Sequence, residues 1–104
     1  MVTLKTRAKS AKFSYERTLD GTIRIEYGNQ REISITESDY QRLIVAFKGQ
    51  RASLGASRTL PPRGSVGEWL QQHVTRTAIA SYIGAILIHE NRAICTDDFT
   101  LQFL

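Results

Sequence analysis

Glu26 and Glu32 are the two residues whose type and spacing best suit acid–base chemistry. Each alternates with isoleucine in a short stretch, and Gly28-Asn29-Gln30 separates the two stretches. If a three-residue turn joins two strands here, the carboxylates stand opposite each other on the polar face of a sheet. Paired carboxylates can share a proton or hold a metal ion. On an exposed sheet such a pair is usually solvated, here beside Arg24, so we predict no catalytic residue and keep a small hydrolase or lyase only as an alternative.

Metal and redox chemistry have weaker support. His73, His89 and Cys95 are not spaced as the ligands of a zinc site, so we predict no metal and no cofactor. Cys95 is the only cysteine of the chain, which excludes an internal disulfide and is typical of a reducing compartment. We therefore expect a cytoplasmic protein.

A basic loop over Gly55-Gly64 is the most suggestive binding feature. Ser65 and Glu68 have the spacing of a capping box, so a helix is predicted to begin directly after this loop. Free amides and the dipole at a helix start attract anions, and arginine can hold phosphate with two hydrogen bonds. The candidate anion-binding residues are Arg58, Arg63, Gly64, Ser65, Val66 and Gly67. The alternative is an ordinary structural loop, since the ending of a Walker phosphate loop is absent.

Composition limits the remaining classes of protein. The 104 residues are 41% apolar, which is enough for one hydrophobic core. The longest uncharged apolar run, residues 78–88, is far shorter than the ~20 residues of a membrane span, so we expect no membrane association. The net charge is +4, with five basic and two acidic residues in 1–20 and five basic and one acidic in 48–76. We expect a basic flexible arm over 1–11 and a single α+β domain over 12–104.

Alternating apolar residues in the first third of the chain predict three strands with one buried face. A three-residue loop, Leu19-Asp20-Gly21, pairs Tyr15 with Ile25 and places glycine where the turn needs a left-handed residue. The result is an antiparallel meander that is apolar on one face. Arg17 lies on the same face as the alternating apolar residues Phe13, Tyr15, Ile23, Ile25, Tyr27, Ile33 and Ile35.

Three helices are predicted after the meander. Thr36 is a suitable N-cap for the first, and Ser65 for the second. The third covers Thr77–Glu90 and is capped by Thr75 or Thr77; because it lacks a polar stripe, we expect it to be buried on all sides. Residues 92–95 and 99–103 predict a short hairpin. The fold class is therefore α+β, with an N-terminal three-stranded antiparallel meander, three helices packed on its apolar face and a short C-terminal β-hairpin.

One face of the third helix carries small residues that would let another backbone approach closely. It either packs inside the domain or contacts a second copy of the chain, and two-fold dimers are the commonest oligomers. We expect a homodimer, with internal packing as the alternative. The candidate interface residues are Ala80, Ser81, Gly84, Ala85, Ile88, Phe103 and Leu104.

From Thr36 onward, the predicted order of helix, short strand, helix, turn, helix and two strands resembles that of a winged helix. The resemblance implies that Thr77–Glu90 would contact DNA, but this segment contains no lysine or arginine, and phosphate contacts need cations. The sequence therefore favours a small non-catalytic binding module whose basic loop contacts an anionic partner. A nucleic-acid-binding protein is the first alternative.

Overall fold

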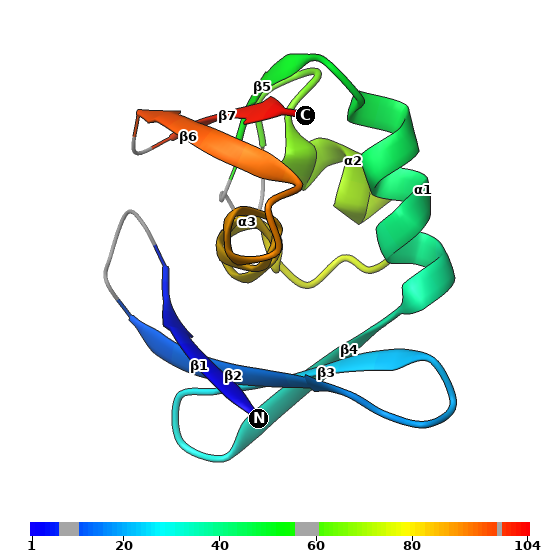
Figure 1. The fold of residues 1–104 in the computed structure, drawn as a ribbon, viewed down its shortest axis with the longest axis vertical. Helices are drawn as coiled ribbons and strands as arrows, with labels where there is room; N and C mark the ends of the chain where they lie inside the picture. The colour runs from blue at the N-terminus through cyan, green and yellow to red at the C-terminus, as the bar shows by residue number, and fades with distance from the viewer. Residues whose placement is uncertain (7–10, 56–60, 98) are drawn as a thin grey trace.

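The computed structural model describes residues 1–6, 11–55, 61–97 and 99–104. These residues form an α+β fold with a four-stranded antiparallel sheet, three helices and a second, three-stranded sheet (Figure 1). The first sheet contains β1 (Val2–Lys5), β2 (Lys12–Arg17), β3 (Thr22–Tyr27) and β4 (Arg31–Thr36). The helices are α1 (Glu37–Phe47), α2 (Val66–His73) and α3 (Ala80–His89). The second sheet contains β5 (Arg51–Ser53), β6 (Ala93–Asp97) and β7 (Thr100–Phe103).

The strands β2, β3 and β4 form the predicted meander in the predicted register. Tyr15 pairs with Ile25, and Ile25 pairs with Ile33 on the next strand. The first turn needs its glycine, because Gly21 has a φ of +83°, in the left-handed region that other residues rarely adopt. This register directs every second side chain of the meander to one buried face.

A fourth strand, β1, extends the sheet beside β2, where the sequence predicts only three strands. Leu4 pairs with Phe13 across the two strands, and Val2 and Leu4 pack half-buried against the core. Residues 2–5 of the expected flexible arm are therefore part of the sheet. Two alternating apolar residues are too few to distinguish a strand from a tail. Residues 7–10 of the arm lie outside the described residues.

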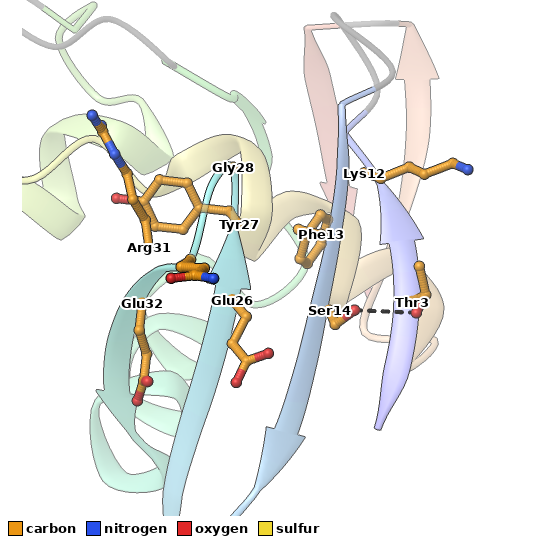
Figure 2. A pocket seen from close by; sticks show the side chains of 10 residues that line it. Thr3, Lys12, Phe13, Ser14, Glu26, Tyr27, Gly28, Arg31 and Glu32 are labelled. Carbon is orange, nitrogen blue, oxygen red and sulfur yellow. Dashed lines mark hydrogen bonds between the residues drawn. The ribbon is translucent and has the colours of Figure 1, made fainter.

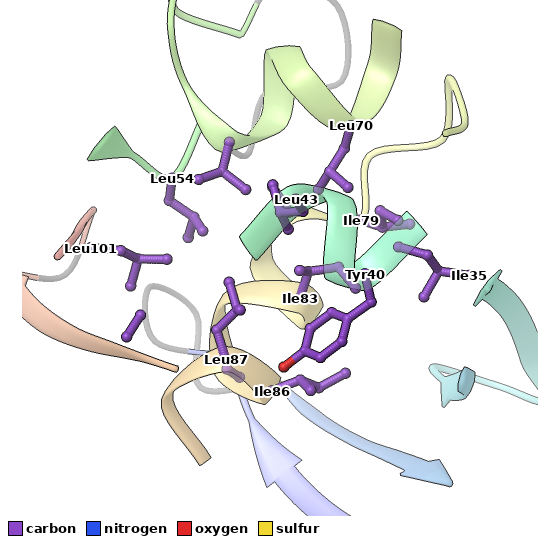
Figure 3. Close-up of a cluster of buried hydrophobic side chains, with 14 of the residues drawn as sticks. Ile35, Tyr40, Leu43, Leu54, Leu70, Ile79, Ile83, Ile86, Leu87 and Leu101 are labelled. Carbon is purple, nitrogen blue, oxygen red and sulfur yellow. The ribbon is translucent and has the colours of Figure 1, made fainter. Parts of the chain in front are cut away.

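Helix α3 lies between the two sheets, at the centre of the fold (Figure 1). Ile83, Ile86 and Leu87 are fully buried. Burial of each such side chain contributes about 1.5–3 kcal/mol. The predicted burial on all sides is incomplete, because Ser81, Tyr82 and Ile88 are half-buried and His89 is exposed. Figure 3 shows the surrounding side chains, which come from β4, α1, α2, β7 and the segment after β5: Ile35, Tyr40, Leu43, Leu70, Leu101 and Leu54.

The start of α3 differs from the prediction. The helix begins at Ala80 rather than Thr77, and Ile79 occupies its N-cap without a side-chain cap hydrogen bond to any described residue. The hydroxyl of Thr75 instead accepts a hydrogen bond of 3.2 Å from the Thr77 amide. The threonines therefore form a local turn before α3 and do not cap it.

The small-residue face of α3 packs inside the chain around Gly84. A Cβ atom at this position would lie 2.7 Å from Cδ1 of Leu54 and 3.7 Å from Cδ1 of Leu101. Leu54 follows β5 and Leu101 lies in β7, so the absent side chain lets the second sheet approach the helix. Close approach of a neighbour is a common reason for glycine inside a helix.

The expected C-terminal hairpin is present as β6 and β7, and β5 adds a third strand to it in the order β5-β7-β6. The order α1-β5-α2-α3-β6-β7 agrees with the predicted sequence of helix, short strand, two helices and two strands. One expectation is wrong, because α2 lies on the opposite side of α3 from the first sheet and does not cover its apolar face (Figure 1).

The first two helices begin at the predicted caps. The hydroxyl of Thr36 accepts a hydrogen bond of 3.0 Å from the amide of Asp39 at the start of α1. The hydroxyl of Ser65 accepts one of 3.1 Å from the amide of Glu68 at the start of α2. Among the helices in the described part of the chain, none is long and apolar enough to cross a bilayer.

Candidate anion-binding site

The strongest polar cluster of the structure surrounds Glu90, the residue that follows α3. Arg17 donates two hydrogen bonds to its carboxylate, at 2.5 Å to Oε2 and 2.8 Å to Oε1. The hydroxyls of Tyr15 and Tyr40 each donate one at 2.9 Å. Arg17 also donates from Nε to Glu37 at 3.0 Å. The cluster therefore ties the end of α3 to β2 and α1.

These contacts shift the pKa values of their members. Hydrogen bonds from Arg17, and then from Tyr40 and Tyr15, lower the pKa of Glu90 to about 2, although burial of the carboxyl opposes this. Burial and the hydrogen bond to Glu90 raise the pKa of Tyr15 to about 12. The same two causes raise the pKa of Tyr40 well above its usual range.

Perturbed pKa values often mark functional sites, but ion-pair networks within a fold produce them too. Here both oxygens of Glu90 are occupied by donors from the chain itself, and only 17% of the side chain is exposed. We therefore assign the Glu90 cluster to stability. The sequence carried one signal for it, since Arg17 lies on the buried face of a strand and a charge there needs a partner.

Glu26 and Glu32 stand directly opposite each other on β3 and β4, as the register predicts. Arg24 lies between them, with Nη2 at 3.6 Å from Glu26 Oε1 and Nε at 3.8 Å from Glu32 Oε1, and it also pairs with Glu16. The two glutamates line a shallow hollow of about 450 Å³ on the outer face of the sheet (Figure 2). Because Arg24 offsets both charges, we assign no acid–base role to this pair.

The start of α2, where the sequence predicts an anion-binding site, is covered by another segment of the chain. Ser65, Val66 and Gly67 are buried, and the Gly67 amide donates to the carbonyl of Leu54 at 2.9 Å. A Cβ at Gly67 would meet the carbonyl oxygen of Gly55 at 1.8 Å, so another backbone segment already occupies the approach to this amide.

The remaining members of the predicted anion site lie at the surface or outside the described residues. The Gly64 amide donates to the Glu68 carboxylate at 2.9 Å, and Arg63 is exposed. Arg58 is not among the described residues. Contact of this loop with an anion stays a prediction that rests on Arg63 and Arg58.

The predicted interface residues are divided between the interior and the surface. The members Ala80, Gly84, Ala85 and Phe103 are buried, Ser81 and Ile88 are half-buried, and Leu104 is 56% exposed. The chain itself therefore covers most of the small-residue face. Dimer formation stays a prediction, for which these residues offer only part of a surface.

A second basic feature appears where the turn before α3 approaches the β3–β4 hairpin. Arg31 from β4 and Arg76 and Thr77 from the α2–α3 connection line one hollow of about 250 Å³ with Tyr27 and Tyr82. The two tyrosine rings contact each other, with centroids 4.9 Å apart and planes tilted by 37°. The hollow is thus lined by two aromatic rings and two arginines.

No acidic side chain lines this hollow. Arg17, Arg24 and Arg42 each pair with a carboxylate, whereas within the described ranges Arg31 and Arg76 do not. Figure 2 shows Arg31 extending beside the ring of Tyr27 and away from the Glu26 and Glu32 carboxylates. Two cations without counter-charges in one hollow form an electrostatic site for an anion.

Sequence patterns did not point to this hollow. Arg31 looks like an ordinary residue after a turn, and Arg76 lies in a short break between helices. Their proximity depends on how the β3–β4 hairpin packs beside α3, through Tyr27 and Tyr82. Sequence spacing gives no signal for this pair, because Arg31 lies in a strand and Arg76 lies in the connection between two helices.

No group of three or more His, Cys, Asp or Glu side chains gathers among the described residues in a way that would hold a metal ion. His73 stacks on Trp69 with centroids 4.4 Å apart, and its Nδ1 lies 2.9 Å from the Trp69 carbonyl oxygen.

Comparisons with protein-family models, curated proteins and solved structures find no match for this chain. The function must therefore be inferred from the geometry alone.

Proposed function

We propose that this chain is a non-catalytic binding module whose partner presents a phosphate group to the hollow between Arg31 and Arg76. The observation that carries the proposal is the presence of these two arginines, without carboxylate partners in the described structure, in one hollow. Guanidinium groups hold phosphate through pairs of charge-assisted hydrogen bonds. The hydroxyl of Thr77 adds a donor at the same place.

The size of the hollow limits what enters it. About 250 Å³ is below the usual range of sites that enclose a drug-sized ligand. It suits one phosphate group carried on a larger molecule, with the rest of that molecule on the surface. The rings of Tyr27 and Tyr82 form an apolar wall for whatever carries the phosphate.

Nucleic acid is the alternative partner, and the winged-helix order of α1 to β7 favours it. In that arrangement the third helix usually enters the major groove. Here α3 lies between two sheets (Figure 1). It also contains no lysine or arginine that could contact phosphates or bases. The alternative is therefore limited to contacts of Arg76, Thr77 and Arg31 with the phosphate backbone of the nucleic acid, without recognition of its bases.

Retention on immobilised heparin in a salt gradient tests the proposal. The double variant Arg31→Ala with Arg76→Ala should elute at clearly lower salt than the wild type, because it loses both cations that line the hollow. The matched control, Arg51→Ala with Arg92→Ala, removes the same charge from two exposed arginines elsewhere. It should elute much closer to the wild type.

Equal losses for both double variants would show that retention follows net charge and would overturn the site. Phosphorylated and unphosphorylated peptides and a short DNA duplex then identify the source of the phosphate. Binding of the duplex alone, lost in the Arg31 and Arg76 variant, would support the nucleic-acid alternative.

A further inference from the structure

A groove with a largely apolar surface lies between α1 and α2. Its volume is about 510 Å³, and its lining includes Val45, Ala46 and Trp69. Val45 is 72% exposed although it is an aliphatic residue on an otherwise well-packed helix. An exposed apolar surface of this kind, framed by polar side chains, is typical of an interaction site.

Two basic side chains of the groove, those of Arg42 and His73, flank its tryptophan. The guanidinium of Arg42 lies 5.7 Å from the Trp69 ring centroid, and the His73 ring stacks on Trp69 at 4.4 Å. Arg42 pairs with Asp39 through Nη1 at 2.9 Å. Among the described residues, its other nitrogens have no carboxylate partner and remain able to donate. The groove therefore fits an apolar side chain that has a carboxylate beside it.

The tip of the β6–β7 hairpin has this chemistry. Phe99 is 62% exposed, and its amide donates to the carboxylate of Asp97 at 2.8 Å. The carbonyl of Phe99 accepts from the Leu54 amide at 2.7 Å, which ties Phe99 to the segment after β5. The hairpin thus presents a phenyl ring with a carboxylate next to it.

The groove is lined by α1 and α2, and these helices lie on the opposite side of the molecule from the outer end of β6 and β7 (Figure 1), so Phe99 cannot reach the groove of its own chain. We propose that Phe99 of one copy binds the Trp69 groove of a second copy, with Asp97 beside Arg42 and His73. The contact is heterologous, because the two surfaces of one copy face opposite ways and two copies cannot make both contacts with each other at once. It therefore produces head-to-tail rings or open chains rather than a two-fold dimer.

This association is expected to be weak. One aromatic side chain and its immediate neighbours bury less surface than the ~1,200 Å² of a small specific interface. We expect a dissociation constant on the order of 100 μM. Sedimentation should therefore be measured up to millimolar concentration, where the mean mass should rise above the 11.7 kDa of one chain.

Two variants separate the two surfaces. Phe99→Ser removes the ring from the tip and leaves the groove intact, whereas Val45→Glu places a charge in the groove and leaves the tip intact. Both positions are exposed, so both variants should fold, which circular dichroism checks. Each variant alone should lose self-association by about tenfold or more. An equimolar mixture should form a dimer that stops growing, because it pairs the one good groove with the one good tip.

Trp69 is the only tryptophan of the chain, so its fluorescence reports directly on the groove. Its emission should shift to shorter wavelength when Val45→Glu is added to Phe99→Ser. A wild type that stays at 11.7 kDa at millimolar concentration, or a mixture that stays monomeric, would overturn the proposal. Wild-type-like association of Val45→Glu alone would also overturn it, because another surface would then be responsible.

Discussion

Arg17 and Arg31 belong to the same sheet, one at the end of β2 and one at the start of β4, but their surroundings are opposite. Arg17 contacts two carboxylates, Glu90 and Glu37, and lies 5.6 Å from the ring centroid of Tyr40. Arg31 has no carboxylate partner within the described residues and lines a hollow with a second arginine, Arg76.

The difference separates charges that hold the fold from charges available to a partner. The donors and acceptors around Glu90 come from three segments of the chain and satisfy one another, so the cluster gains nothing from a ligand. The hollow at Arg31 and Arg76 gains the favourable energy of a counter-charge only when an anion arrives. Breaking the first cluster should change stability, and breaking the second should change binding.

The largest effect is expected for Glu90→Gln. The amide keeps the size of the side chain but cannot pair with the charge of Arg17, and it leaves the two tyrosine hydroxyls with a weaker acceptor. Because 41% of Arg17 is exposed and water can solvate it, we expect a loss of about 2 kcal/mol in the free energy of unfolding. Urea denaturation followed by circular dichroism measures it.

The control for this prediction is Glu37→Gln, which removes the other carboxylate of Arg17. Glu37 is 37% exposed and receives one hydrogen bond from Arg17, so we expect a loss below about 1 kcal/mol. A Glu90→Gln variant as stable as the wild type would show that the cluster does not support the fold.

The second predicted effect is a loss of folding stability at acid pH. The unfolded chain protonates Glu90 near its ordinary pKa of 4.5, whereas the folded chain resists protonation down to about 2. The stabilisation from Glu90 is therefore complete above pH 4.5 and decreases as the pH falls from 4.5 towards 2. Allowing for solvent screening of Arg17, it amounts to about 2 kcal/mol.

Urea denaturation at several pH values checks this profile. Wild type and Glu90→Gln should converge in stability as the pH falls through the window, because the variant has no carboxyl to protonate. A constant difference between the two proteins down to pH 2 would contradict the assigned pKa.

The smallest effect on stability is expected for Arg31→Ala with Arg76→Ala. Both side chains are exposed and neither pairs with a carboxylate in the described structure, so the free energy of unfolding should change by no more than about 0.5 kcal/mol. Thermal or urea denaturation measures it. A loss above about 1 kcal/mol would mean that these arginines hold the fold, and the contrast with Arg17 would disappear.

Local patterns predicted much of the fold. The alternation in β2 to β4 and the glycine at position 21 determine the register of the meander, and Thr36 and Ser65 mark two helix starts. These features depend on residues close together in the chain. The lack of charged residues in α3 is also a local feature, and it predicted that most of this helix is buried.

Features that depend on distant segments could not be predicted. Glu90 pairs with Arg17 across most of the chain, and the sequence offers several other acidic residues as partners for that arginine. The start of α2 looked like an anion site, but Gly55 and Leu54 enclose it. The hollow at Arg31 and Arg76 exists only because the β3–β4 hairpin packs beside the start of α3.

Titration of the ¹⁵N-labelled protein with inorganic phosphate shows whether Arg31 and Arg76 form one anion site. We expect saturable shifts of the amide signals of Arg31, Arg76, Thr77 and Ala78, and no such shifts in the Arg31→Ala, Arg76→Ala variant. Shifts confined to the residues around Arg63 and Ser65, or no saturable shift, would contradict this expectation.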